Sequence, residues 1–326
     1  MAGTMTHAYF ARDVYNKLND NIKEKLNYSN ENMKTYGQGH DIFYFYYSLN
    51  FKKASKIRKE SKRFHRKNTK DFFINIVEYI KSNNLENDSD SLSFLYGYIC
   101  HYVMDSIIHP YVIYKGGIFE KKKKETYKYN SLHSVIETYI DAYMININEN
   151  IEPGKFKNYK FCFNCTKNDN LINLINYAFE NTYNFKNASK YFFKSIKTMK
   201  FLYHLTRYDP LKIKYRIYAL FDKITSKKIK KATPITYAVK LNNDEYYLNL
   251  NHNVWSHPRY DTEKHTESFF DLYNNATNEA LRIINGVNEV LFNNKNIEFL
   301  DDYFLNLSFI TGKDCSDKAR NQYFEF

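Results

Sequence analysis

Apolar residues recur every three or four positions over most of the chain, which indicates amphipathic helices rather than alternating strands. In the first half, the pattern predicts helices at about 8–26, 30–36, 41–50, 53–64, 68–84, 90–109 and 131–148. In the second half, it predicts helices at about 170–184, 187–206, 209–226, 262–291 and 296–308. The segment 234–250 alternates enough to form short strands or an extended crossing. The pattern therefore predicts an all-α protein.

A break in this periodicity divides the chain near its middle. The stretch 149–169 contains Pro153 and Gly154 and has the character of a boundary. We therefore expect one domain at 1–150 and a mainly helical C-terminal extension at 151–326. Only five prolines and nine glycines occur in 326 residues, which also favours long helices over a turn-rich fold.

The chain carries a formal net charge of +12, which suits anionic partners such as phosphate esters, nucleic acid or acidic lipid surfaces. The basic runs 52–70 and 121–124 could contact a membrane surface, although such runs are more often solvated. The N-terminus lacks the basic and apolar pattern of a signal peptide, and no segment has the roughly 18 consecutive apolar residues of a spanning helix. We expect a cytoplasmic protein.

Two predicted helices carry acidic and imidazole side chains at a strict four-residue step: His101, Asp105 and His109 on the first, and His133, Glu137 and Asp141 on the second. Residues four apart lie on one face of a helix, so each set would form a stripe. The flanking residues are largely apolar, and buried charged groups are costly unless they are paired or bind a metal. One such pair could be a simple ion pair, but two helices with the same pattern favour a metal site.

A turn with two glycines, Gly37 and Gly39, precedes a third candidate, Asp41. Asp41 is predicted to begin an aromatic-rich helix, where its carboxylate could cap the helix without any metal. We expect the adjacent His40 to line the mouth of the pocket.

Several short motifs together resemble the zinc-dependent phospholipase C family, whose fold is shared with bacterial lecithinases and fungal single-strand nucleases. The motifs are Thr6-His7-Ala8-Tyr9-Phe10-Ala11, Gly39-His40-Asp41-Ile42-Phe43, Phe64-His65-Arg66, the run from Gly97 through His101 and Asp105 to His109-Pro110, and His133-x3-Glu137. Their order matches the family over about residues 5–148. The resemblance implies a multi-helix bundle of the phospholipase C and single-strand nuclease type at 1–150.

The resemblance also implies a set of metal ligands. It assigns one zinc to Asp41, His65, His101 and Asp105, and a second zinc to His109, His133 and Glu137. In secreted members a third metal uses the processed amino terminus, a histidine that corresponds to His7, and the shared Asp105. This chain starts Met1-Ala2-Gly3 with no signal to cleave, so its third site departs from the family pattern. Asp141 has no ligand counterpart, and we expect it to accept a hydrogen bond from an imidazole N–H.

These assignments predict a zinc-dependent phosphoric diester hydrolase of the phospholipase C type. Zinc would polarise a phosphoryl oxygen and activate water, and Asp41 would orient or deprotonate that water. The expected substrate is a phospholipid, with possible peripheral contact to a membrane surface. One alternative is a phosphodiesterase resembling the single-strand nucleases, which would use the positive charge to bind nucleic acid. Another is a non-catalytic binding protein braced by zinc, against which the excess over four ligands argues.

Overall fold

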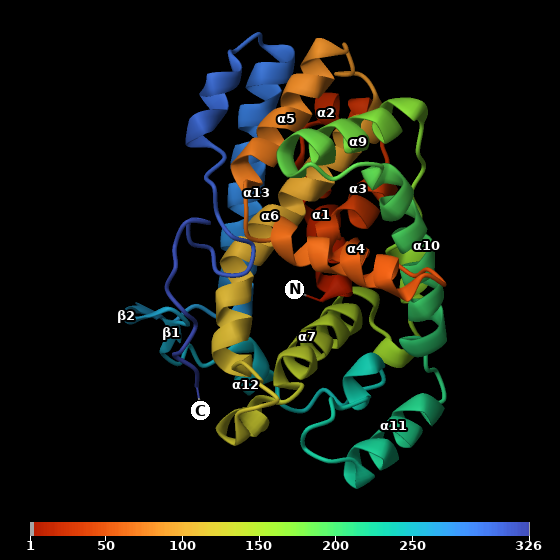
Figure 1. Cartoon of the computed structure of the whole chain (residues 1–326), viewed down its shortest axis with the longest axis vertical. Helices are drawn as coiled ribbons and strands as arrows, with labels where there is room; N and C mark the ends of the chain where they lie inside the picture. Colours follow the sequence, from red (N-terminus) through yellow and green to blue (C-terminus); the bar gives the residue numbers. More distant parts are fainter. Residues whose placement is uncertain (1–2, 326) are drawn as a thin grey trace.

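A long buried helix, α6 (Ser89–Gly116), runs through the centre of the molecule (Figure 1). The computed structural model describes residues 3–325 of the chain. Nearly every residue of α6 is buried, as expected of a helix that is apolar around most of its circumference. The helix was expected at about 90–109, but α6 continues to Gly116 with Pro110 inside it.

Four helices make the most extensive contacts with α6. They are α1 (Thr4–Lys17), α3 (Glu31–Tyr36), α7 (Leu132–Glu149) and α13 (Phe269–Phe292). Helices α5 (Thr69–Ser82) and α9 (Asp169–Tyr183) also contact it. Because α13 belongs to the second half of the chain and lies along α6, both halves of the sequence share one hydrophobic core. The boundary expected near residue 150 stays a prediction.

The remaining elements complete the fold. The other α-helices are α2 (Asp20–Lys25), α4 (Phe51–Phe64), α5 (Thr69–Ser82), α8 (Asn158–Phe161), α9 (Asp169–Tyr183), α10 (Ala188–Thr206), α11 (Ile213–Ile224) and α12 (Asp244–Leu248). The 3-10 helices are η1 (Gly39–Phe45), η2 (Lys124–Tyr129), η3 (Pro153–Lys155), η4 (Thr233–Ile235) and η5 (Ile297–Asp302). Strands β1 (Trp255–His257) and β2 (Tyr260–His265) pair as an antiparallel hairpin. The all-α prediction is confirmed.

Several local predictions were wrong. The helix expected at 296–308 is the shorter 3-10 helix η5, which ends at Asp302. The helix expected at 8–26 is two helices, because Asn19 caps a new one by accepting a hydrogen bond from the Ile22 N–H at 2.9 Å. The helix expected at 41–50 is the shorter 3-10 helix η1. The strands lie at 255–265, after the segment where they were expected. Helix α13 begins at Phe269 rather than near residue 262, at a capping box formed by Ser268 and Asp271.

No helix within residues 3–325 combines the length and the apolar character required to cross a bilayer.

A buried carboxylate, Asp141 of α7, ties the beginning of α1 to the rest of the bundle. Its side chain accepts hydrogen bonds from the Thr6 N–H at 2.8 Å, the Thr6 hydroxyl at 2.6 Å and the Tyr237 hydroxyl at 2.6 Å. The Thr6 N–H lies in the first turn of α1, where backbone donors lack partners within the helix and attract negative charge. The expectation that Asp141 accepts from an imidazole was therefore wrong, since its partners are hydroxyls and a helix N-terminus.

We expect Asp141→Asn to lower the free energy of unfolding by about 1.5–3 kcal/mol, the range for losing hydrogen bonds to a buried charged group. The amide would place an N–H donor against groups that themselves donate. Urea denaturation followed by circular dichroism measures this. The control is Asp301→Asn, which removes an exposed ion pair with Lys70 and should change stability by less than about 0.5 kcal/mol. Equal stability of Asp141→Asn and the parent chain would contradict this role.

Candidate metal centre

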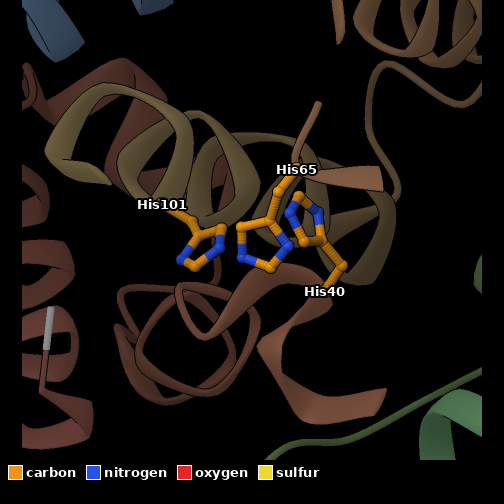
Figure 2. Close-up of side chains that lie close together, drawn as sticks. All are labelled: His40, His65 and His101. Atoms are coloured by element: carbon orange, nitrogen blue, oxygen red, sulfur yellow. The ribbon is translucent and has the colours of Figure 1, made fainter. Parts of the chain in front are cut away.

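The eight side chains selected as metal ligands converge beside the middle of α6. One group consists of His7, Asp41, His101 and Asp105, and another consists of His109, His133 and Glu137. In each group, one possible ligand atom from every residue lies within 4.8 Å of those from the others. The eighth residue, His65, forms an overlapping group with His40 and His101 (Figure 2).

The first group is assembled from three separate elements. His7 lies on α1, Asp41 on η1, and His101 and Asp105 lie one turn apart on α6. The His7 Nε2 atom is 3.3 Å from Asp105 Oδ1, and His101 Nε2 is 3.6 Å from Asp105 Oδ2. Asp105 thus faces imidazoles from two helices, as the four-residue step on α6 and the resemblance required.

A glycine allows η1 to approach α6 closely enough to deliver Asp41. Gly39 has a φ of +52°, in the left-handed region that residues other than glycine rarely adopt. A Cβ atom at this position would lie 2.0 Å from Cδ2 of His101. The two-glycine turn in the sequence therefore has a structural reason, and Asp41 lies inside the 3-10 helix rather than capping an α-helix.

His65 is oriented by its own helix. It follows the last turn of α4, and its Nδ1 atom is 2.6 Å from the carbonyl oxygen of Ser61. A carbonyl can only accept, so Nδ1 donates to it and Nε2 faces the cluster. That Nε2 atom lies 2.8 Å from Asp41 Oδ1, which places His65 beside the first group.

His40 was expected at the mouth of the pocket, but the structure buries it. Only 2 % of the residue is exposed, and its ring centroid lies 4.0 Å from that of His65 and 5.1 Å from that of His101. Figure 2 shows the three rings turned toward one another. The Nδ1 atom of His40 is 2.9 Å from the Tyr98 hydroxyl, so its Nε2 atom remains for the cluster.

Burial controls the charge of these groups. It lowers the pKa of His40, His101 and His109 well below the ordinary value for histidine. Burial also raises the pKa of Asp41, and the adjacent His65 opposes this rise only in part. The three histidines are therefore neutral at neutral pH, which is the form in which imidazole binds metals.

The second group forms the open edge of the centre. The Nε2 atoms of His109 and His133 are 3.4 Å apart, and His133 Nε2 is 2.9 Å from Glu137 Oε1. His109 is buried, whereas the His133 side chain is 32 % exposed. A ligand from solvent can therefore reach this group on the α7 side.

A backbone carbonyl from the far end of the chain holds His109. The carbonyl oxygen of Phe309 lies 3.3 Å from His109 Nδ1, so this nitrogen donates and Nε2 faces His133. The Phe309 N–H donates to the carbonyl of His65 at 3.0 Å, and the Phe309 ring packs on His40 and His101. Sequence reasoning missed this contribution, since a carbonyl acceptor carries no residue signature.

Several buried polar atoms in this arrangement have no hydrogen bond inside the protein. Within residues 3–325, they include both ring nitrogens of His7 and His101 and the Nε2 atom of His40. The Nε2 atom of His65 and the Oδ1 atom of Asp41 face each other at 2.8 Å. Buried polar atoms in folded proteins nearly always have partners, because the cost of leaving one unpaired is about 1–3 kcal/mol. Convergent imidazole nitrogens and carboxylate oxygens are the donor set that zinc accepts. The residues present therefore fit zinc.

Comparison with known families places this centre in context. A family model described as zinc-dependent phospholipase C matches residues 6–184. Searches of curated proteins and of solved structures gave no match. The matched segment spans more than half of the chain and contains every residue of the three groups, and the all-α fold agrees with the type that the resemblance implied. The chain belongs to the zinc-dependent phospholipase C family.

Proposed function

We propose that this chain is a metal-dependent phosphodiester hydrolase of the phospholipase C type. Its metal ligands would be His7, Asp41, His65, His101, Asp105, His109, His133 and Glu137. The observation that carries the proposal is the convergence of buried imidazoles and carboxylates on one region, where the ring nitrogens of His7 and His101 have no hydrogen bond within the described residues. The number of ligands exceeds the four of a structural zinc site, which argues against a role limited to bracing the fold.

Each part of the centre has a distinct task in this proposal. Bound zinc would supply Lewis acidity toward a phosphoryl oxygen and toward water. Asp41, which contacts His65 and lies within the first group, would orient or deprotonate the attacking water. Ser61 and Phe309 hold the imidazoles of His65 and His109 through carbonyl contacts, which keep the Nε2 lone pairs directed inward. We expect two zinc ions, and His7 with Asp105 would contribute to a third site.

The substrate class follows from the family and from the charge of the chain. A phospholipid is a phosphodiester whose anionic group suits a protein of net charge +12. The part-exposed His133 provides a route by which a lipid head group could reach the centre. Action on nucleic acid is the second candidate, because the same charge also favours a polyanion. Residence in the cytoplasm stays a prediction.

Turnover assays on two substrates test the proposal. We expect the zinc-loaded chain to release the phosphorylated head group from short-chain phosphatidylcholine and to leave single-stranded DNA intact. His101→Ala should lower this activity by more than about a hundredfold, since losing a ligand costs more than losing one of its supporting contacts. The control is His204→Ala, which changes an exposed histidine on α10 and should keep full activity.

Two results would count against this function. Cleavage of DNA with no action on the lipid would favour the nuclease. No turnover of either substrate by a chain that retains its zinc would favour a zinc-braced binding protein.

Metal content gives an independent prediction. We expect about two zinc ions per chain by plasma mass spectrometry after dialysis against metal-free buffer, since two groups of ligands exist. His133→Ala should reduce this to about one, because it leaves the second group with two ligands. His265→Ala, on the β-hairpin, is the matched control and should bind as much zinc as the parent chain. Identical zinc content in His133→Ala and the parent chain would rule out the second group as a site.

A further inference from the structure

Helix α11 turns its apolar stripe away from the protein. Every residue of α11 is at least partly exposed. Five large apolar residues occur at positions that share one face, with exposed fractions from 41 % to 76 %: Ile213, Ile217, Leu220, Phe221 and Ile224. In a globular protein such a stripe normally faces the core. Figure 1 shows α11 at the lower end of the molecule, outside the main bundle.

Neighbouring segments extend this apolar surface. Leu211 before the helix, and Ile229 and Ile235 after it, are exposed by 71 %, 49 % and 40 %. A hollow of about 630 Å³ lies between α11 and the start of α7, and Ile217, Phe221, Ile229 and Ile235 contribute to its wall. Contiguous exposed apolar surfaces of this kind mark interaction sites in proteins.

The charge around this surface is strongly positive. Residues 211–231 contain eight lysines and arginines but only one acidic residue, Asp222. The Asp222 carboxylate is engaged within the loop, where it accepts hydrogen bonds from the N–H groups of Ala232 and Thr233. The exposed basic side chains are Arg216, Lys223, Lys227, Lys228, Lys230 and Lys231. An apolar helical face flanked by lysines is typical of helices that lie in the interface of an anionic membrane.

This surface is joined to the open edge of the metal centre. The Asn130 side chain donates to the carbonyls of Lys227 and Ile229 at 2.6 and 2.7 Å, and the Lys231 N–H donates to the Ser131 hydroxyl at 2.7 Å. Asn130 and Ser131 directly precede α7, whose second residue is His133. The hollow beside α11 is also lined by Ser131 and Ser134, which flank this histidine in the sequence. A bilayer against α11 would therefore lie close to the exposed side of the candidate metal site.

We propose that α11 and the return segment 225–235 dock the chain on the surface of an anionic lipid bilayer. The proposal rests on the proposed function in one respect, since it supplies the surface from which a phospholipid head group would reach the metal centre. The charge favours lipid over a second copy of the chain, because two patches that each carry a net positive charge repel each other. The apolar stripe would enter the boundary between head groups and acyl chains while the lysines contact anionic head groups.

Co-sedimentation of the full chain with vesicles tests this docking without any turnover. We expect stronger binding to vesicles of phosphatidylcholine mixed with phosphatidylglycerol than to pure phosphatidylcholine, and weaker binding as salt is raised. Leu220→Glu combined with Ile224→Glu should lower binding at least tenfold. The matched control combines Val254→Glu with Leu305→Glu, two residues of similar exposure outside this surface, and should bind like the parent chain.

A second variant lies outside α11 and therefore serves as a test if Leu220→Glu and Ile224→Glu disrupt the fold of that helix. Lys227→Glu combined with Lys228→Glu should also lower binding at least tenfold, since the attraction of each lysine to an anionic surface is lost and repulsion is added. Neither variant changes a residue of the metal centre. Both should therefore hydrolyse monomeric short-chain phosphatidylcholine like the parent chain, so a failure of docking and a failure of the proposed activity are separately visible.

Three outcomes would overturn the proposal. The first is equal binding of the parent chain to neutral and anionic vesicles. The second is unchanged vesicle binding by both variants. The third is a parent chain that does not bind vesicles and forms a dimer by light scattering, while the variant with both Leu220→Glu and Ile224→Glu is a monomer. That result would assign the surface to a second copy of the chain.

Discussion

The burial of titratable groups inside an apolar helix is the constraint on which the rest of this structure depends. His101, Asp105 and His109 lie on α6 in the middle of the core, where water cannot solvate them. An unpaired charge or polar atom there costs several kcal/mol, so the fold must bring compensating groups to this stripe. Imidazoles can be buried there in their neutral form, without an unpaired charge. A cation bound by the carboxylates would compensate the negative charge of the acids.

Most of the surrounding elements place a side chain next to these buried residues of α6. α1 brings His7, η1 brings Asp41 across a turn that only glycine permits, and α7 brings His133. The C-terminal segment closes the cluster from another direction, through the backbone and ring of Phe309. The extension is thus in contact with the centre rather than remote from it. In a metal site, loss of a group that orients a ligand typically lowers metal affinity or activity by about 10–100-fold.

Helical spacing and the order of motifs are local features, and the candidate ligands selected from them lie close together in the structure. His101 and Asp105 follow from the four-residue step, and the resemblance added Asp41 and His65. Contacts between distant segments left no such trace. Asp141 was expected to serve an imidazole, but its partner is Thr6, 135 positions away in the sequence. Periodicity also predicted a helix near α11, yet it cannot indicate that the apolar side of that helix faces solvent, because that depends on what the rest of the chain leaves uncovered.

Anomalous scattering from crystals grown with zinc tests the central claim most directly. Data collected above and below the zinc absorption edge locate each ion independently of activity. The account predicts one peak enclosed by Asp41, His65, His101 and Asp105 and a second enclosed by His109, His133 and Glu137. Crystals with zinc in the medium but no peak within either group, or with peaks only at surface histidines such as His204, would contradict it.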